Sequence, residues 1–312
     1  MWNRLLPPLE KSAGTSRRSI TNRLDRYRLM LSPEPGSVVS TFLRARFNAE
    51  SVQDSLSPEA WATITNLRTR FQRARFREDI AENQAVANTR RTADFVTQVI
   101  PQFFAVCSNT MLADDGWRFC EIGQMIERAI ITANSVVSIT AALAPATAGR
   151  EVTAQASEIE LSAFLRLLGT RDAYRRIYQM RAEPRNVLEL LLQHSEVPRS
   201  VFRCITRCGA LLRESTAQEI TSAATAVAGV EDLAHRLKRI DWTGYVRQAQ
   251  DEDQIESGPE ESRSARTYDL EPLLKRLLGA TAEMHSLIAD SFLNHQARIA
   301  QVSQPVLRGL VP

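Results

Sequence analysis

Residues 114–129 of this chain read DDGWRFCEIGQMIERA and show the periodicity that decides the fold. At 100° per residue, the apolar positions of this stretch and of the next turn form one stripe, which comprises Phe119, Ile122, Ile126, Ala129 and Ala133. Asp114 and Asp115 precede the stripe and place negative charge at the positive end of a helix dipole. The pattern predicts a long helix from Asp114 to about Leu143 with one face buried in a core.

The same helical spacing returns along most of the 312 residues. Segments with an apolar residue at every third or fourth position lie near 58–80, 84–112, 159–168, 216–240 and 269–301. Pro101 is expected to kink or split the second of these helices, whereas Pro184 and Pro198 mark expected helix starts. No stretch shows a clear strand pattern. The sequence therefore predicts an all-α fold, a multi-helix antiparallel bundle.

Charge and composition suggest how the chain is organised. Residues 1–36 hold seven basic and three acidic side chains and form a basic amino-terminal segment, for which poor order is one expectation. Residues 37–312 are expected to form the helical domain. Small and polar residues at 144–157 predict a connection between two helical halves. Residues 251–262, with six acids and no base, predict an acidic flexible loop.

The composition excludes several classes of protein. With 44% apolar and 24% charged residues, the chain is typical of soluble globular proteins. No stretch approaches the roughly 18 apolar residues of a membrane-spanning helix, and the first residues lack a secretory signal, so we expect a cytoplasmic protein with no membrane contact. The four cysteines include no CxxC pair and the four histidines are scattered, so we expect no metal and no cofactor. A nearly neutral body behind the basic start argues against nucleic acid as a partner.

Arginine greatly outnumbers lysine in this chain. Of 39 basic residues only three are lysines, which leaves 36 arginines. One explanation is a compositional bias of the coding sequence. The other is a need for forked donors that bind a carboxylate or a phosphate through two hydrogen bonds at once. Both explanations stay open at this point.

A polar row lies on a different side of the helix expected at 114–143. It comprises Arg118, Glu121, Gln124, Arg128 and Thr132. Glu121 is three residues from Arg118 and seven from Arg128, so its carboxylate is expected between two guanidinium groups. Glu127 points away from this row, and Gly123 suggests that another helix approaches closely. The row is either a salt-bridged surface or a groove in which the arginines bind an anion and a glutamate, Glu121 or Glu127, acts as a base.

Two further clusters carry candidate binding residues. Tyr174 and Arg175 belong to an amphipathic stretch that is expected to line a ligand pocket, an RNA surface or the boundary of the core. A helix that begins at Pro198 would direct its first amides, with Arg199 and Ser200, at a nearby anion, unless these residues only cap the helix.

These residues resemble the alpha-E domain family, an all-helical bacterial group named for its Glu-Arg motif. The shared motifs occur in the family's order within residues 37–300: Asn109–Leu112, Asp115–Phe119, Ile126–Ala129, Asp172–Tyr178, Glu183–Arg185 and Pro198–Val201. The first Glu-Arg helix of the family is not found in residues 1–36. The resemblance implies the company of circularly permuted ATP-grasp proteins, transglutaminase-like proteins and a proteasome-like peptidase.

The resemblance and the candidate residues favour an accessory or substrate-binding helical module. Its partner is expected to be a circularly permuted ATP-grasp protein, with a transglutaminase-like protein as a further candidate, in a system that forms amide or peptide bonds or tags peptides. The arginines would hold a peptide-like substrate, provided that the three clusters meet around one anion-binding hollow. A first alternative is an enzyme for aminoacyl or amide transfer that uses Glu121 or Glu127. A second alternative is an RNA-binding helical protein.

Overall fold

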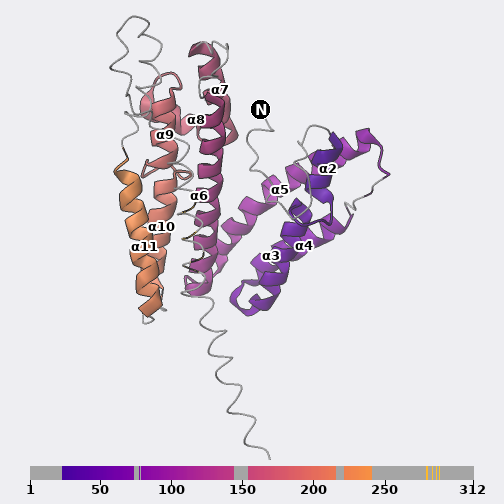
Figure 1. The fold of residues 1–312 in the computed structure, drawn as a ribbon. Helices are drawn as coiled ribbons and strands as arrows, with labels where there is room; N and C mark the ends of the chain where they lie inside the picture. Colours follow the sequence, from indigo (N-terminus) through magenta and orange to yellow (C-terminus); the bar gives the residue numbers. More distant parts are fainter. Residues whose placement is uncertain are drawn as a thin grey trace, which may run out of the picture. The chain divides into compact units, whose positions relative to one another are not determined.

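The computed structural model describes residues 23–73, 77, 79–143, 154–215 and 221–240, together with Gly279, Glu283, Ser286 and Ile288 (Figure 1). These residues are 81% helical and include no strand, so the predicted all-α, multi-helix fold is confirmed. The chain divides into two compact units, Met1–Phe119 and Cys120–Pro312, and the division falls inside the long helix α6 (Asp115–Leu143).

The first unit is built from helices that precede α6. Its described elements are α2 (Arg23–Leu31), α3 (Val38–Ser51), the 3-10 helix η1 (Gln53–Ser55), α4 (Pro58–Arg73) and α5 (Glu82–Thr110). Tyr27 and Leu31 of α2 are buried in its core with Phe71 of α4 and Val99 of α5. Residues 23–31 of the basic segment 1–36 therefore form a helix that contributes two side chains to a packed core, whereas residues 1–22 lie outside the described residues.

Helix α5 continues through Pro101, so of the two expected effects of this proline, a kink or a split, the split is wrong. Proline removes one amide donor from the helix ladder, which on its own favours a break. Here α5 packs against both α2 and α4. Val99, two residues before the proline, and Cys107, six residues after it, are both buried. Tertiary packing on both sides of Pro101 therefore outweighs the lost hydrogen bond.

The second unit contains most of α6 and the helices that follow it. Its further described elements are α7 (Ala154–Leu167), α8 (Arg171–Tyr178), α9 (Pro184–Leu192), α10 (Val201–Glu214) and α11 (Thr221–Lys238). Figure 1 shows α10 and α11 side by side, and these two helices pack extensively against each other. A Cβ added to Gly209 of α10 would meet Val230 of α11 at 3.5 Å. This is an ordinary van der Waals distance, so the contact would also accept an alanine at this point.

Of the two helices that were expected to begin at a proline, one does and the other does not. Pro184 is the first residue of α9, as predicted. The helix expected at Pro198 instead begins at Val201, with Ser200 as its N-cap residue. Ser200 N donates to Val197 O at 2.9 Å, which closes a four-residue turn with Pro198 at its second position. The second position of such a turn suits the fixed φ of proline, as the first position of a helix does. The prediction therefore placed the helix start three residues early.

The predicted connections fall largely outside the described residues. Helix α6 ends at Leu143 and α7 begins at Ala154, so residues 154–157 of the connection expected at 144–157 belong to a helix. The acidic loop expected at 251–262 lies outside the described residues. Within the helix expected at 269–301, the four residues that the structure describes are helical.

Candidate functional site

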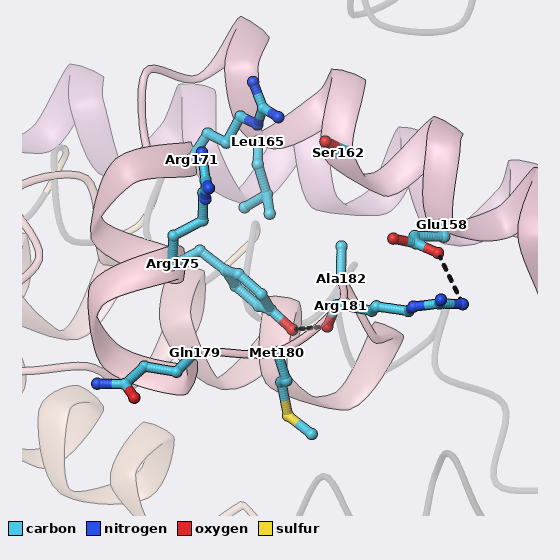
Figure 2. A pocket seen from close by; sticks show the side chains of 10 residues that line it. Glu158, Ser162, Leu165, Arg171, Arg175, Gln179, Met180, Arg181 and Ala182 are labelled. Carbon is cyan, nitrogen blue, oxygen red and sulfur yellow. Dashed lines mark hydrogen bonds and ion pairs between the residues drawn. The ribbon is translucent and has the colours of Figure 1, made fainter.

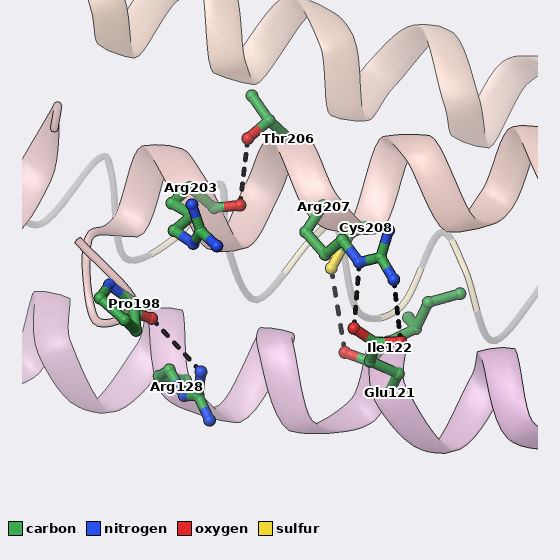
Figure 3. Close-up of polar contacts among 8 residues, drawn as sticks. All are labelled: Glu121, Ile122, Arg128, Pro198, Arg203, Thr206, Arg207 and Cys208. Carbon is green, nitrogen blue, oxygen red and sulfur yellow. Dashed lines mark hydrogen bonds and ion pairs between the residues drawn. The ribbon is translucent and has the colours of Figure 1, made fainter. Parts of the chain in front are cut away.

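Glu121 of α6 is held by Arg207 of α10. The Nε atom of Arg207 donates to Oε1 of Glu121 at 3.0 Å, and Nη2 donates to Oε2 at 3.1 Å (Figure 3). These hydrogen bonds raise the pKa of Arg207. Both carboxylate oxygens are engaged, so the pair links two helices of the second unit. The expected row, with Glu121 between Arg118 and Arg128, is wrong, because the carboxylate pairs with a residue 86 positions away.

Arg118 lies at the end of the first unit and has its own acidic partner. Its Nη1 atom is 3.2 Å from Oδ1 of Asp115, one turn earlier on α6. The Arg118 side chain is 17% exposed, and its Nε atom is buried without a hydrogen-bond partner among the described residues. Arg118 is therefore a paired, largely buried cation.

Arg128, Arg199 and Arg203 gather near the start of α10, and we call them the arginine cluster. Arg128 Nη1 donates to Pro198 O at 3.3 Å, and Arg203 Nη1 donates to Ser195 O at 3.1 Å. In Figure 3, the Arg128 side chain extends from α6 toward Pro198. Arg203 is drawn on α10, with Arg207 further along the same helix. None of the three forms an ion pair with a carboxylate in the part of the chain that the structure describes.

The electrostatics of the cluster follow from burial and like charge. Burial lowers the pKa of Arg199, and the positive charge of Arg128 lowers it further. Burial raises the pKa of the Cys204 thiol to about 11. The charges of Arg128, Arg203 and Arg199 act in the opposite direction on that pKa, so all three guanidinium groups lie within electrostatic reach of one thiol. The cluster is therefore a local concentration of positive charge.

Ser200 lies inside this group at the N-cap position of α10. The residue is fully buried, and its hydroxyl has no hydrogen-bond partner among the described residues. It makes no side-chain cap bond, although a serine at this position commonly accepts a hydrogen bond from the first turn. The structure thus brings Arg128, Arg199 and Ser200 of the predicted anion site together, and it adds Arg203, which the sequence analysis did not select.

The polar side of α6 near Glu127 faces solvent. Glu127 is exposed. Gly123 is also exposed, and a Cβ added there would have no neighbour within 4 Å in the described structure. The expectation that Gly123 marks a close helix approach is therefore wrong.

A cavity of about 520 Å³ lies between α7, α8 and the segment that follows α8 (Figure 2). It is lined by Glu158, Ser162, Leu165, Arg171, Tyr174, Arg175, Gln179, Met180, Arg181 and Ala182. Gln179 ends α8 in the left-handed conformation, with φ of 52°, and the chain turns there so that residues 180–182 line the cavity. Arg181 Nη1 is 3.7 Å from Oε2 of Glu158.

Tyr174 shapes this cavity through its hydroxyl. The side chain is 2% exposed, and its hydroxyl donates to Arg181 O at 2.7 Å and accepts from Glu183 N at 3.1 Å. The ring packs against Tyr178 with centroids 4.9 Å apart. Because the hydroxyl is already satisfied, Tyr174 acts by holding the segment after α8 in place.

The predicted site residues do not share one hollow. The cavity is lined by Tyr174 and Arg175 of the prediction, but by no residue of α6 and by neither Arg199 nor Ser200. Arg199 instead belongs to the arginine cluster with Arg128 and Arg203, and Ser200 is its neighbour in the chain. The sequence analysis missed three residues of these sites: Arg207, Glu158 and Arg181. Arg207 pairs with Glu121, which is distant in sequence, and Glu158 contacts Arg181, which lies in the irregular segment after α8.

The described residues include no group of three or more histidine, cysteine or acidic side chains that could hold a metal ion. None of the described helices combines the length and the hydrophobicity of a membrane span.

Comparison with known proteins assigns the chain to a family. The sequence model of Alpha-E, a predicted alpha-helical domain with a conserved ER motif, matches residues 1–293. The chain belongs to this family, and Glu127 and Arg128 are the Glu-Arg pair on which the resemblance was based. The match begins at residue 1, so the segment 1–36, which we placed outside the resemblance, falls within it. Comparisons with curated proteins and with solved structures gave no match.

Proposed function

We propose that this chain is an accessory, substrate-binding helical module of an ATP-grasp-dependent system that forms amide or peptide bonds or tags peptides. Its partner is a circularly permuted ATP-grasp protein, which supplies the ATP chemistry. Its substrate is peptide-like and carries a carboxylate or an acyl-phosphate group. The arginine cluster of the second unit binds that anionic group. Family membership supports the first part of the proposal, and the chemistry of the cluster supports the last.

The arginine cluster is the single observation that carries this proposal. Three guanidinium groups lie near one another, and Arg199 loses part of its hydration through burial. Like charges repel, and burial strengthens that repulsion because water screens it less. An anion between the guanidinium groups would remove the repulsion and accept charge-assisted hydrogen bonds, often two from one arginine. The cluster therefore has the properties of a receptor for a carboxylate or a phosphoryl group.

The two glutamates support a binding role over a catalytic one. Glu121 has both oxygens bound to Arg207, so its carboxylate is committed to a link between α6 and α10. Glu127 is exposed and faces water, whereas a catalytic carboxylate acts in a site that excludes water. Neither side chain lines the cavity. We therefore assign Glu121 a structural role and assign no proton transfer to either residue.

Co-purification tests the partner. The full chain is tagged at its chromosomal position in the native host, and the proteins that elute with it are identified by mass spectrometry. We expect an ATP-grasp protein at a ratio close to one copy per chain. Repeated purifications from cells that express such a protein without its recovery would refute the partnership.

Product analysis tests the arginine cluster. Small peptides from the host are compared by mass spectrometry between the natural chain and the Arg128→Ala and Arg199→Ala variants, and we expect the dependent products to fall at least tenfold. Arg213→Ala is the matched control, because Arg213 lies on α10 but already pairs with Glu231. Unchanged products in both cluster variants, with normal amounts of folded protein, would remove the cluster from the site.

A further inference from the structure

We infer that the cavity between α7 and α8 is a second binding site, and that it takes a short linear peptide with a free ammonium group and a free carboxylate. The inference concerns residues outside the arginine cluster. It needs no ATP-grasp partner, so it goes beyond the function proposed above. The argument rests on the order of charges along the cavity, its length and its size.

The charges of the cavity are separated along its length. Glu158, Ser162 and Leu165 project from one face of α7 because they are four and three residues apart. Figure 2 shows Glu158 at one end of the view and Arg171 and Arg175 toward the other, with Leu165 near the arginines. One end thus offers the Glu158 carboxylate, which Arg181 contacts at 3.7 Å, and the other offers two guanidinium groups. A ligand that satisfies both ends has a cation and an anion at its own two ends.

The stretch of α7 that lines the cavity, from Glu158 to Leu165, sets the length of the ligand. Seven residues of α-helix separate Glu158 from Leu165, which corresponds to about 10 Å along α7. An extended peptide covers about 3.3–3.6 Å per residue, so this span matches a peptide of about three residues. A single amino acid is too short to reach both ends. The cavity volume of about 520 Å³ is of the order found for small-molecule sites, roughly 300–1,000 Å³.

The residues between the charged ends suit a peptide of varied sequence. Ser162 and Gln179 offer side-chain hydrogen bonds, whereas Leu165, Met180 and Ala182 offer apolar surface. Peptide groups need polar partners, and small side chains pack on apolar surface. The lining residues would therefore recognise the two ends of the peptide by their charge and its middle residue by its shape.

Arg181 already contacts the carboxylate end, but only weakly. Its Nη1 atom is 3.7 Å from Glu158, and the Arg181 side chain is 85% exposed. An exposed ion pair of this kind shifts an equilibrium by a factor of about five at most. A peptide ammonium group can therefore displace Arg181 at small cost, and Arg181→Gln is expected to strengthen peptide binding or to leave it unchanged.

Titration of the full chain with alanine peptides tests the site. Binding of trialanine is measured by calorimetry at low salt and compared with alanine, N-acetyl-trialanine and trialanine amide. We expect alanine to bind at least tenfold more weakly than trialanine, and each blocked peptide at least threefold more weakly. These comparisons use the natural chain, so they do not depend on whether a variant folds.

Variants then assign each end of the ligand. Glu158→Gln is expected to abolish the difference in affinity between trialanine and N-acetyl-trialanine. Arg171→Gln is expected to abolish the difference in affinity between trialanine and trialanine amide. Glu160→Gln and Arg176→Gln are matched controls on α7 and α8, because neither residue lines the cavity. Both controls are expected to keep the trialanine affinity of the natural chain.

Three results would overturn the inference. They are no binding of any alanine peptide, equal binding of free and blocked peptides, or inorganic phosphate competing with trialanine at equal affinity, which would indicate a simple anion site. Loss of the ATP-grasp partner would leave the peptide titration unaffected, and failure of the titration would leave the co-purification result unaffected. The two proposals can therefore fail separately.

Discussion

The hydroxyl of Tyr174 is predicted to hold the irregular segment that lines the cavity. Tyr174→Phe removes a donor to Arg181 O at 2.7 Å and an acceptor for Glu183 N at 3.1 Å. Each such hydrogen bond contributes about 0.5–1.5 kcal/mol net. Arg181 and Glu183 are exposed, so water can replace part of the loss. We therefore expect a cost of about 1–2 kcal/mol, concentrated in the segment after α8.

Amide hydrogen exchange measures this cost where it arises. A loss of about 1.4 kcal/mol corresponds to about tenfold faster exchange of the Glu183 amide, if exchange proceeds through local opening. Tyr178→Phe is the matched control on the same helix, because the hydroxyl of Tyr178 is buried and has no hydrogen-bond partner among the described residues. Its removal is expected to be neutral or stabilising. Equal exchange rates in the natural chain and in Tyr174→Phe would refute the assigned role.

Three further predictions concern α10 and its neighbours. Ser200→Ala should leave the urea midpoint unchanged or raise it slightly, because the hydroxyl is buried, makes no cap bond and has no partner in the described structure. Burial raises the pKa of Cys204 from 9.0 to about 11, so folding favours the neutral thiol. The free energy of unfolding should therefore be highest below pH 9 and should fall as the pH rises from 9 through 11. A Cys204→Ala variant should show a smaller fall in the urea midpoint over this range. Arg207→Lys should lower the free energy of unfolding by about 1 kcal/mol, because lysine can replace only one of the two hydrogen bonds to Glu121.

The helices were predictable because local periodicity reflects burial. In α10 the buried positions Val201, Cys204, Ile205 and Cys208 follow the helical pattern i, i+3, i+4, i+7, as buried positions do in α6. Helix ends were less predictable. Pro184 starts α9, whereas Pro198 lies in a turn, and both positions suit the fixed φ of proline. Local sequence does not distinguish these two uses, so the error at Pro198 has a physical origin.

The candidate site was predictable only where its parts are close in sequence. Arg199 and Ser200 are neighbours in the turn at 197–200, and Arg128 donates to Pro198 O of the same turn. The partner of Glu121 is 86 residues away, and no local pattern identifies Arg207. The cavity depends on the left-handed turn at Gln179, a conformation that a glutamine seldom adopts. Long-range pairing and irregular backbone therefore account for what the sequence analysis missed.

The excess of arginine now has two explanations that apply to different places. Where an arginine meets an acid, as Arg207 meets Glu121, the fork makes two hydrogen bonds that a lysine could not make. A bias of the coding sequence toward arginine is enough to explain arginines of this kind, because they stabilise the fold and need no ligand. The arginine cluster differs, because burial and like charge disfavour it and no described carboxylate compensates. A bias in composition explains why arginine is abundant, but it does not explain why Arg128 lies where its charge adds to the cost of burying Arg199. Binding of an anion does explain it, and for this reason the functional explanation is the stronger one at the start of α10.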